Sequence, residues 1–450
     1  MSIEVVNPAT GEAFAEAPDC SPEQLDEAFA AAAAALPAWA ADEDARWAAM
    51  VELAEAIVAA GPELLDLVVL ETGKPRALAE VETIASDAWL RYYAESEIPR
   101  PLISEDEGPR LEQRHRPVGV VAGIVPWNFP VGNAIWKIAP AMRTGCTLVL
   151  KPSPFTPLAT LRLGEIASEI LPPGVVTVVS GGDQLGALMS EHPLPRKVAF
   201  TGSIGTGKRV AASAAPDLKR VTLELGGNDA AILLDDVDLE AAAPAVFGMA
   251  TFNAGQVCVI PKRVYVPDSR YEEALEAFAA AAEAISLGAG DEGQMGPLIT
   301  KPQYERVTRL VAAALANGAR AVSGGAPADR PGYFFPPTVI ADAGDGEELV
   351  AEEQFGPVLP ILRYGDPEEA VARANGTMYG LCGSVWGADP ERAQALAERL
   401  ECGVAYVNAH GELLPQMPFG GAKWSGIGVE NGAEGLLEYT ERQLVFKGKG

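Results

Sequence analysis

Residues 198–207 read VAFTGSIGTG, an apolar run that continues into a turn rich in glycine, serine and threonine. The apolar part predicts a short buried strand, and a helix is expected to begin at Ser203. Glycines in such a turn let a ligand approach the backbone closely, and a helix N-terminus favours an anion. The glycine order differs from the GxGxxG pattern of a standard dinucleotide fold, so the turn alone indicates phosphate binding only weakly.

Short β-rich runs alternate with helical segments on both sides of this stretch. Strands are predicted at residues 120–125, 147–150, 175–179 and 198–200, and, after Gly226-Gly227, at 230–234, 263–266, 358–362 and 404–407. Helices are predicted through Trp136, at 161–170, from Ser203, and at 238–250, 270–285, 302–316 and 390–400. Such alternation is typical of parallel sheets with helices on both faces. The predicted fold class is therefore α/β, with two successive open sheets and a seam near Gly226-Gly227.

The first hundred residues are predicted to be helical. Helices are expected from Ser21-Pro22, from the acids near residue 42 until Gly61-Pro62, and at 80–95. Prolines and charges at 99–117 predict an excursion from the core rather than a core element.

Length and composition bound the class of protein. The chain has 450 residues, 48% hydrophobic and 21% charged, which is ordinary globular usage and enough for two or three domains. Its 34 basic and 62 acidic residues give a net charge of −28. Because such a surface repels polyphosphate and anionic lipid, we expect neither nucleic acid nor membranes as partners. One small anionic cofactor in a locally positive cleft is still compatible with this charge.

The five cysteines are widely spaced, odd in number and without a CxxC pair. This pattern fits neither a disulfide framework nor a structural zinc site, so we expect no metal and a reducing compartment. The N-terminus lacks the basic and apolar regions of a signal peptide. The longest apolar run, residues 28–41, is too short and too rich in alanine to cross a bilayer. A cytoplasmic protein is the simplest interpretation.

Cys258 ends the motif FNAGQVC at 252–258, where a predicted helix and a Gly-Gln turn could expose the thiol in a cleft. A nucleophilic cysteine needs help to ionise and a partner for the charge that it generates. The alternative is a buried, inert thiol. A Cys–His hydrolase is a further alternative, although His115, His192 and His410 lie in no recognisable cysteine-protease signature.

Asn128 lies in the turn PWNFP at 126–130, directly after a predicted strand. Two prolines restrict this turn, so the side-chain amide would be held in one place. A fixed amide N–H stabilises a developing oxyanion. The alternative is a turn asparagine that bonds to its own backbone.

Two charged residues lie at the ends of predicted strands. Glu224 stands between apolar neighbours before Gly226-Gly227, and partial burial would raise its pKa toward that of a general base. Its alternative role is structural, as a carboxylate capped by N–H groups of the glycine turn. Lys151, followed by Pro152-Ser153, adds positive charge at the sheet edge where open α/β sheets bind ligands.

Together these motifs resemble those of the aldehyde dehydrogenase superfamily, in order and spacing, over essentially the whole chain. The matching motifs are NPATG at 7–11, PWNFP at 126–130, KPS at 151–153, FTGS at 200–203, ELGG at 224–227, FNAGQVC at 252–258, EQFGP at 353–357 and PFGG at 418–421. The resemblance implies a discontinuous Rossmann-like cofactor domain at 1–98 and 118–226. It also implies a catalytic domain at 227–424 and a small β oligomerisation arm at 99–117 and 436–450.

The implied reaction is oxidation of an aldehyde to its acid with NAD or NADP. By resemblance, Cys258 attacks the carbonyl, and the Asn128 amide and the Cys258 backbone N–H hold the oxyanion. Hydride then leaves to the nicotinamide, and Glu224 activates water to hydrolyse the thioester. Lys137 and Glu430 match positions of a proton relay.

The cofactor-binding residues that the resemblance implies are Trp127, Lys151, Ser153, Thr201, Gly202, Ser203, Gly207, Leu225, Glu353 and Phe355. Pro154 stands where many NAD-preferring relatives have a glutamate that accepts from the adenosine ribose hydroxyls. Without that carboxylate a 2′-phosphate is not repelled, so the choice between NAD and NADP is left open. Val429 is a second departure from the family, which often has an arginine at the position before the glutamate that matches Glu430.

The residues that align with the family's substrate channel are Phe129, Asn133, Trp136, Val257, Val259, His410, Leu413 and Phe419. Asn133 and His410 are polar where many relatives are apolar, which predicts a substrate with a hydroxyl or amide beyond the aldehyde carbon. The alternative is that His410 only bonds to the loop that contains Glu412.

The implied partners are a small aldehyde and further copies of the chain, as a homodimer or homotetramer. The arm, with a C-terminal strand at 443–447, would leave open strand edges in a monomer. Two alternative functions stay open. One is a dehydrogenase that transfers the acyl group to coenzyme A, and the other is a catalytically silent structural relative.

Overall fold

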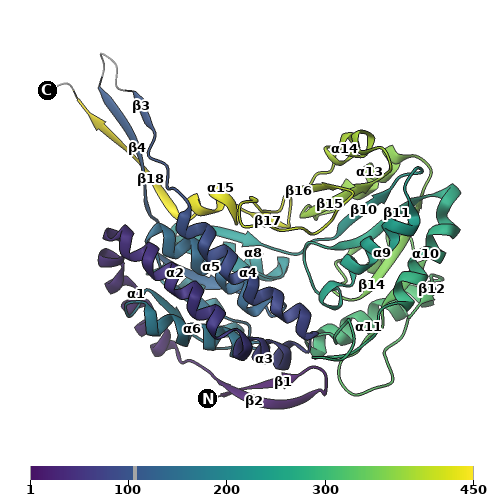
Figure 1. The fold of residues 1–450 in the computed structure, drawn as a ribbon, viewed down its shortest axis with the longest axis horizontal. Coiled ribbons are helices and arrows are strands. Elements are labelled where there is room, and N and C mark those ends of the chain that lie inside the picture. The colour runs from purple at the N-terminus through teal and green to yellow at the C-terminus, as the bar shows by residue number, and fades with distance from the viewer. Residues whose placement is uncertain (1, 105–108, 449–450) are drawn as a thin grey trace.

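The computed structural model describes residues 2–104 and 109–448, which form two large sheets that follow one another along the chain (Figure 1). The first sheet has the strand order β17-β9-β8-β5-β6-β7. Its strands are β5 (Val120–Ile124), β6 (Thr147–Lys151), β7 (Val176–Val178), β8 (Lys197–Thr201), β9 (Arg220–Glu224) and β17 (Gly426–Ile427). Neighbouring strands are parallel except for β17, which is antiparallel to β9.

Helices cover both faces of this sheet because its strands are apolar on both faces. Val121 and Leu148 belong to the core beneath α2, α4, α5 and α6, whereas Val120 and Val198 belong to the core beneath α1, α7 and α8. The helices are α1 (Pro22–Ala41), α2 (Glu43–Ala59), α3 (Gly61–Thr72), α4 (Arg76–Glu95), α5 (Pro130–Thr144), α6 (Leu158–Ile170), α7 (Asp183–Glu191) and α8 (Ile204–Ala214), with the short η1 (Ala215–Asp217).

The second sheet has the order β12-β13-β14-β11-β10-β15-β16, with only β12 antiparallel to its neighbour. Its strands are β10 (Asp229–Leu233), β11 (Pro261–Pro267), β12 (Arg320–Ser323), β13 (Thr338–Ala341), β14 (Val358–Tyr364), β15 (Cys382–Trp386) and β16 (Val404–Val407). Its helices are α9 (Leu239–Ala250), α10 (Tyr271–Glu283), α11 (Lys301–Ala316), α12 (Glu348–Ala351), α13 (Pro367–Asn375) and α14 (Pro390–Ala397), with η2 (Phe252–Gly255) and η3 (Asp268–Arg270). Only residues 225–228 separate β9 from β10, so the two sheets meet at this short linker.

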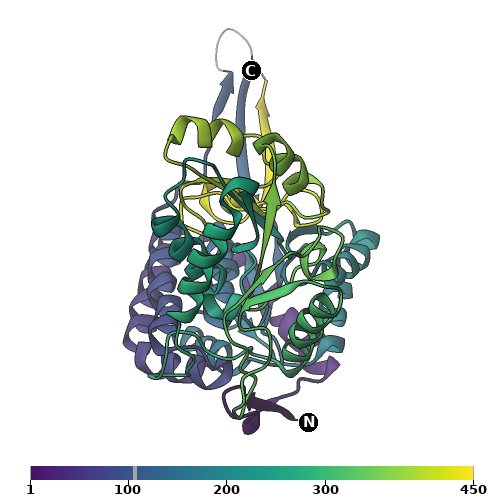
Figure 2. The ribbon, with the colours of Figure 1, turned by 90° about the vertical axis from the view of Figure 1, so that its right-hand side faces the viewer.

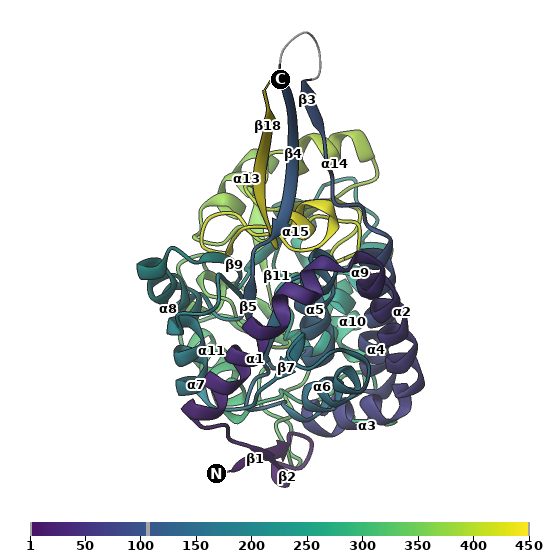
Figure 3. The ribbon, with the colours of Figure 1, turned by 90° about the vertical axis from the view of Figure 1, so that its left-hand side faces the viewer.

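Two small antiparallel units project from opposite ends of the molecule (Figures 2 and 3). An N-terminal hairpin consists of β1 (Ser2–Asn7) and β2 (Glu12–Pro18). At the other end, β3 (Leu102–Ser104), β4 (Arg110–Pro117) and β18 (Thr440–Lys447) form a three-stranded arm with the order β18-β4-β3. α15 (Gly432–Leu437) leads into β18.

The strand order of the first sheet reverses next to β5, which creates a topological switch point. β6 and β7 lie on one side of β5, and β8 and β9 lie on the other. Ligands bind such sheets in the crevice at the carboxyl ends of the strands beside the switch point. The register pairs Ile124 with Lys151 on one side and with Phe200 on the other, and pairs Thr201 with Glu224. The residues that follow β5, β6, β8 and β9 therefore emerge along one edge.

The predicted fold class, two open α/β sheets with a small β arm, is confirmed. The prediction that the first hundred residues are helical was wrong for the β1–β2 hairpin, in which exposed and more buried residues alternate along Ser2–Val5 and Phe14–Ala17. The prediction that the second helix ends at Gly61-Pro62 is confirmed, because α2 ends at Ala59; the same two residues then begin α3, which was not predicted. The strands β12, β13, β15 and β17 were not predicted, and β9 was predicted only through its end at Glu224. Within the described ranges, no helix is long and apolar enough to span a membrane.

Candidate active site

The turn after β5 holds Asn128 between the two sheets. Its side chain is buried, and its Nδ2 donates to the carbonyl oxygen of Gln256 at 2.9 Å. The carbonyl oxygen of Asn128 accepts from Lys74 Nζ at 2.9 Å and from Asn253 Nδ2 at 3.1 Å. Because its amide nitrogen bonds across to Gln256, Asn128 does not use that group to close its own turn. An amide has two N–H donors, so the second is available for another acceptor.

The loop that carries Cys258 has an unusual backbone. Asn253 and Ala254 both have positive φ values, 52° and 54°, and Gly255 follows with φ +74°. A Cβ at residue 255 would overlap the carbonyl group of Gly356, so only glycine allows this close approach. Lys262 Nζ donates to the Gly255 carbonyl at 2.8 Å and ties the loop to β11. The loop presents Cys258 as a partly exposed free thiol.

Burial raises the pKa of the Cys258 thiol far above its ordinary value. The carboxylates of Glu353, Glu224 and Asp229 add to this effect, and Lys262 opposes it. The resting form of Cys258 is therefore the neutral thiol. Formation of a thiolate at this position requires a base that accepts its proton, or a positive charge brought in by a ligand.

Glu224 is the last residue of β9, and neither of its carboxyl oxygens has a hydrogen-bond partner in the described part of the chain. Burial raises its pKa well above the ordinary value, and the neighbouring Glu430 raises it further, while Lys137 opposes the shift. The alternative in which glycine-turn N–H groups cap this carboxylate is not observed. A buried carboxyl group with a raised pKa and unused oxygens has the properties of a general base.

Lys137 and Glu430 form a buried ion pair close to Glu224. Lys137 Nζ bonds to Glu430 Oε1 and also donates to Thr201 Oγ1 at 2.7 Å. The second oxygen of Glu430 is buried without a partner. The structure thus brings together the two residues predicted as a relay, and Thr201 links them to the end of β8.

The passage from β8 into α8 matches the anion cradle predicted from residues 198–207. Ser203 is the N-cap of α8, and its Oγ accepts from the Thr206 backbone N–H at 3.3 Å. A Cβ at Gly205 would meet no atom within 4 Å, so open space adjoins this helix N-terminus. Gly207 has another role, because a Cβ there would lie 2.5 Å from Leu225 Cδ2. Gly207 and Leu225 therefore let α8 pack closely on the linker between the sheets, and Gly202 bonds through its N–H to the Glu224 carbonyl.

Lys151 ends β6 on the same edge. Its ammonium group is buried and donates to the Pro152 carbonyl at 2.9 Å. Burial lowers the pKa of Lys151 to about 8, although Asp183 and Asp19 oppose the shift. Ser153 shapes the following turn, with its Oγ accepting from the Phe155 N–H at 3.3 Å.

Glu353 and Phe355 approach this edge from the second half of the chain. Glu353 Oε1 accepts from the Gly227 N–H at 3.2 Å, and burial raises the pKa of this carboxyl group to about 7 while Lys262 opposes the shift. Phe355 meets Trp127 edge-on, with ring centroids 5.4 Å apart. A helix N-terminus and an ammonium group suit phosphates, and a carboxylate suits ribose hydroxyls. The residues present therefore fit a dinucleotide.

Apolar and aromatic side chains pack around Cys258. This cluster contains Phe129, Trp136, Val257, Val259, Leu413 and Phe419 from the predicted channel, together with Met249, Phe252, Ile260, Leu381, Cys382, Val404, Tyr406, Ala409 and Met417. Phe129 stacks on Phe252 at 6.2 Å, and Trp136 meets Phe419 at 6.0 Å. Asn133 is linked to this cluster through Phe129, since its Nδ2 donates to the Phe129 carbonyl oxygen at 3.0 Å.

His410 lies behind this cluster with both ring nitrogens engaged. Its Nδ1 is 2.8 Å from Ser384 Oγ, its Nε2 is 3.4 Å from Asp229 Oδ2, and its side chain is fully buried. Trp386 Nε1 also bonds to this serine and donates to Ser384 Oγ at 2.8 Å. The ring stacks on Tyr406, whose hydroxyl donates to the Glu412 carbonyl at 2.7 Å. His410 thus reaches the Glu412 loop only through Tyr406.

Four buried residues around Asn128 and Cys258 were not predicted as site residues from the sequence: Lys74, Glu82, Asn253 and Gln256. Asn253 and Gln256 lie inside the FNAGQVC motif, where two buried amides next to a candidate nucleophile were an available signal. Lys74 and Glu82 gave no such signal, because charged residues near helices are usually exposed to solvent.

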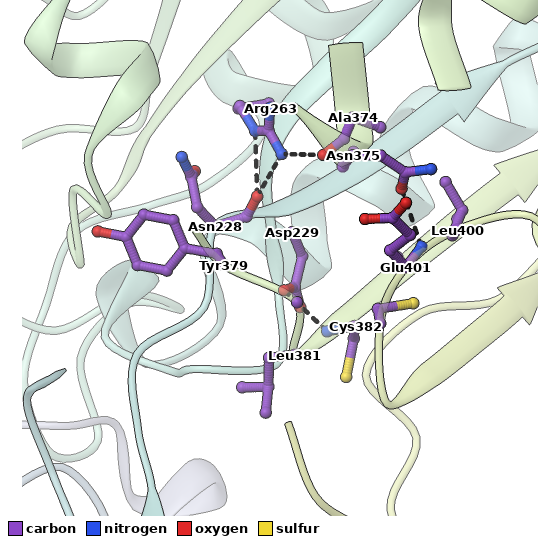
Figure 4. Close-up of a pocket in the computed structure, with 14 residues that line it drawn as sticks. Asn228, Asp229, Arg263, Ala374, Asn375, Tyr379, Leu381, Cys382, Leu400 and Glu401 are labelled. Carbon is purple, nitrogen blue, oxygen red and sulfur yellow. Dashed lines mark hydrogen bonds between the residues drawn. The ribbon is translucent and has the colours of Figure 1, made fainter. Parts of the chain in front are cut away.

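A small cavity of about 20 Å³ lies near the start of β10 and β15 (Figure 4). It is lined by Asn228, Asp229, Arg263, Tyr379, Cys382 and neighbouring backbone, and Asn128, Glu224 and Cys258 do not line it. This volume holds one water molecule and neither an aldehyde nor a dinucleotide. Within residues 2–104 and 109–448, no group of three or more His, Cys, Asp or Glu side chains could hold a metal ion.

Comparisons with known proteins identify the class to which this site belongs. The profile of the aldehyde dehydrogenase family matches residues 1–445. Phenylacetaldehyde dehydrogenase of Pseudomonas fluorescens is 39% identical over 467 aligned residues, covering 99% of this chain and 92% of the relative. Betaine aldehyde dehydrogenase of Cereibacter sphaeroides is 39% identical, covering 100% of this chain and 94% of the relative. The NAD+ complex of aldehyde dehydrogenase from Bacillus cereus has a TM-score of 0.97 at 38% identity, covering 100% of this chain and 94% of that one.

The chain belongs to the aldehyde dehydrogenase family. The predicted superfamily is thereby confirmed, and so is the predicted enzyme class, an oxidoreductase that uses a nicotinamide dinucleotide to oxidise a small aldehyde.

Proposed function

We propose that Cys258, Asn128 and Glu224 form the reaction centre of a hydrolytic aldehyde dehydrogenase. The observation that carries this proposal is the 2.9 Å hydrogen bond from Asn128 Nδ2 to the Gln256 carbonyl. This bond holds the Asn128 amide, which follows a strand of the first sheet, beside the loop that carries Cys258. Within the apolar cluster, Cys258 is the cysteine that is partly exposed, whereas Cys382 is buried.

In the first half of the reaction, the Cys258 sulfur bonds to the aldehyde carbon. Glu224 takes the thiol proton, since its oxygens are otherwise unused. The carbonyl oxygen becomes an oxyanion, which accepts hydrogen bonds from the Asn128 amide and the Cys258 backbone N–H. When bound, NAD+ or NADP+ accepts the hydride that leaves this carbon.

In the second half, the enzyme holds a thioester on Cys258. Before this half begins, Lys137 and Glu430 carry the thiol proton away from Glu224, because their ion pair lies next to it and has one unused carboxyl oxygen. Glu224, ionised again, accepts a proton from water, whose oxygen bonds to the acyl carbon. The carbon–sulfur bond then breaks, the sulfur takes the proton back from Glu224 and the carboxylic acid leaves.

We assign cofactor binding to the domain at 1–98 and 118–226, and the nucleophile to the domain at 227–424. Lys151, Ser153, Ser203 and the start of α8 would hold the phosphates, and Glu353 a ribose. Trp127, Thr201, Gly202 and Phe355 would line the cleft, with Gly207 and Leu225 shaping it. NAD and NADP both fit, because Pro154 supplies no carboxylate against a 2′-phosphate.

For the substrate we propose an aldehyde with an apolar or aromatic chain. Support comes from the side chains around Cys258, of which Phe129, Phe252, Trp136 and Phe419 are aromatic. A chain with a polar group is the second candidate, favoured by Asn133, whose side-chain oxygen accepts no hydrogen bond from residues 2–104 and 109–448 while its Nδ2 donates to Phe129. His410 does not favour it, because both of its ring nitrogens are engaged within the protein.

We propose a homodimer or homotetramer that assembles through the arm at 99–117 and 436–450, of which residues 105–108 and 449–450 lie outside the described residues. Leu102, Ile103, Leu444 and Phe446 of the arm are all exposed, as expected of strands that a second copy covers. The five free cysteines favour the cytoplasm.

The test is a panel of aliphatic, aromatic and hydroxylated aldehydes, assayed with NAD+ and with NADP+ for reduced nicotinamide. Cys258→Ala should abolish turnover while Cys20→Ala, at another partly exposed thiol, should not. Turnover by Cys258→Ala would refute the nucleophile, and a requirement for coenzyme A would favour the acylating alternative. A wild-type protein inactive on every member of the panel would favour the silent relative.

A further inference from the structure

A fully buried ion pair lies beneath the turn that carries Asn128. Lys74 Nζ is 2.7 Å from Glu82 Oε1, and both side chains are 1% exposed. Lys74 directly follows the end of α3, and Glu82 lies in the second turn of α4. Lys74 Nζ also lies over the ring of Phe129, a member of the apolar cluster, 4.1 Å from its centroid.

The two charges hold opposite sides of this turn. Lys74 Nζ donates to the carbonyl oxygen of Asn128 at 2.9 Å. Glu82 Oε2 accepts from the backbone N–H groups of Val131 at 2.9 Å and Gly132 at 3.1 Å, in the first turn of α5. The peptide of Asn128 and the helix that follows it are thus tied to the same pair of charges.

The Asn128 carbonyl oxygen is also the meeting point with the thiol loop. Asn253 Nδ2 donates to it at 3.1 Å, and Asn253 Nδ2 lies 3.5 Å from the Gln256 carbonyl that accepts from Asn128. The donor from Lys74 and the donor from Asn253 therefore restrict one peptide group from two sides. Rotation of that peptide would move the Asn128 amide relative to Cys258.

Fold stability does not explain this arrangement well. Burial of two charges carries a desolvation cost that their attraction barely offsets, and apolar residues of similar volume often serve stability equally well. Burial also lowers the pKa of Lys74, whereas Glu82 opposes that shift. The contacts of the pair with a single functional turn indicate a positional role.

We propose that Lys74 and Glu82 are positioning residues that hold the Asn128 amide where the oxyanion develops. This inference rests on the proposed function, in which Asn128 is the oxyanion donor. A displacement of about 1 Å at a reacting centre can cost about 100-fold in rate. Loss of the Lys74 donor should therefore act mainly on kcat and little on the KM for aldehyde.

The experiment compares Lys74→Met, Glu82→Gln and Asn128→Ala with a matched control, Lys219→Met. Lys219 is also a buried lysine that donates to a backbone carbonyl, Ser190 at 2.8 Å, and pairs with an acid, Asp217 at 3.2 Å. It lies at the opposite end of β9 from Glu224. Each variant is assayed for aldehyde oxidation, for p-nitrophenyl acetate hydrolysis and for alkylation of Cys258 by iodoacetamide.

The alkylation rate distinguishes a displaced Asn128 amide from a damaged fold. Alkylation needs an accessible, reactive Cys258 but creates no oxyanion, whereas attack of Cys258 on an aldehyde or an ester does create one. We expect kcat and ester hydrolysis of Lys74→Met to fall by about 10- to 100-fold. Alkylation should stay close to wild type, Lys74→Arg should recover part of the loss, and Lys219→Met should keep its kcat. Glu82→Gln, which retains the shape of the side chain, should show a smaller loss of the same kind and serves if Lys74→Met does not fold.

The double variant Lys74→Met/Asn128→Ala decides whether Lys74 acts through Asn128. If it does, the double variant is no slower than Asn128→Ala, because residues that act through one group are not additive. Losses that multiply, a parallel loss of alkylation, or an unchanged kcat in Lys74→Met and Glu82→Gln would each overturn the inference. An unchanged kcat in Asn128→Ala would instead refute the oxyanion role in the proposed function.

Discussion

Asn128 Nδ2 lies 2.9 Å from the carbonyl oxygen of Gln256, although 128 positions separate the two residues in the chain. The bond joins the turn after β5 to the loop before β11, and therefore the first sheet to the second. Gln256 is itself held on both sides, because its Nε2 donates to the Asn253 carbonyl and its Oε1 accepts from the Ile299 N–H. The Asn128 amide and the loop of Cys258 are therefore fixed to the same residue.

Glu224→Gln should slow both halves of the reaction, because Glu224 is the proposed base in each. The amide cannot accept a proton from the thiol or from water, so each step should slow by about 100- to 10,000-fold, as for loss of a general base. Any thioester that still forms should persist, and intact-mass spectrometry after mixing with aldehyde and cofactor should find its acyl group on the protein.

In the wild type, hydrolysis of the thioester should become faster as pH rises, since Glu224 has a raised pKa and acts in its ionised form. Glu224→Gln should lose this pH dependence. A Glu224→Gln variant that turns over at the wild-type rate without an acyl adduct would contradict the assignment.

Cofactor affinity should weaken as pH rises through the pKa of Lys151. Burial lowers this pKa to about 8, so the side chain is positively charged below that pH and neutral above it. Loss of the charge removes attraction to the cofactor phosphates. The Kd for NAD+ and for NADP+, measured by titration calorimetry between about pH 7 and about pH 9, should rise in the wild type and stay flat in Lys151→Met. Lys219→Met should retain the wild-type dependence, and a pH-independent wild type would exclude Lys151.

His410→Phe should destabilise the protein by about 1–3 kcal/mol, because it removes the partner of the buried Asp229 Oδ2, whereas the Cys382 N–H still bonds to Oδ1. Burial already raises the pKa of Asp229, and His410 opposes that shift. In the variant the pKa rises further, so the folded state binds a proton more tightly than the unfolded state, and stability falls as pH rises from acidic to neutral. Urea unfolding at several pH values measures this.

The double variant Asp229→Asn/His410→Phe should lose the part of this pH dependence that Asp229 causes and return to a weaker dependence than His410→Phe alone. If His410→Phe is as stable as the wild type but loses kcat/KM selectively for hydroxylated aldehydes, the ring contacts substrate after all.

Leu444→Glu combined with Phe446→Glu should yield monomers. Both side chains are more than half exposed on β18, and a charge there would be buried in the proposed interface. Light scattering after size-exclusion chromatography gives the mass. Leu218→Glu is the control, since Leu218 is 84% exposed away from the arm. An assembly that survives the arm variant would place the interface elsewhere.

Much of the fold could be predicted because local patterns decide it. β16 runs from Val404 to Val407 as predicted, and the capping residues Ser21, Ser203 and Asp238 start helices at the predicted places. The β1–β2 hairpin was missed although Ser2–Val5 alternates polar and apolar residues, because this run is short and the more buried positions of β2 are Ala15 and Ala17, and alanine is a weak strand former.

The candidate site was predictable only as a set of motifs. Strand ends at one edge explain why Lys151, Thr201 and Glu224 come together. Local patterns do not reveal pairs such as Lys74 with Asn128 or His410 with Asp229, because each contact joins residues that are distant in sequence. His410 is an example. The sequence aligns it with the substrate channel, but in the structure its ring is buried and bonds to Ser384 and Asp229.

The N-terminal hairpin links the two lobes of the molecule. The carbonyl oxygen of Pro8 accepts from the Tyr333 N–H at 2.9 Å, and the Pro8 ring packs at Gly73, where a Cβ would also meet the ring of Pro297. The loop between β1 and β2 therefore contacts residues that precede the first sheet and residues that belong to the second lobe. Separation of the two lobes at this end would require these contacts to break, so the hairpin acts as a clasp on the side away from the arm.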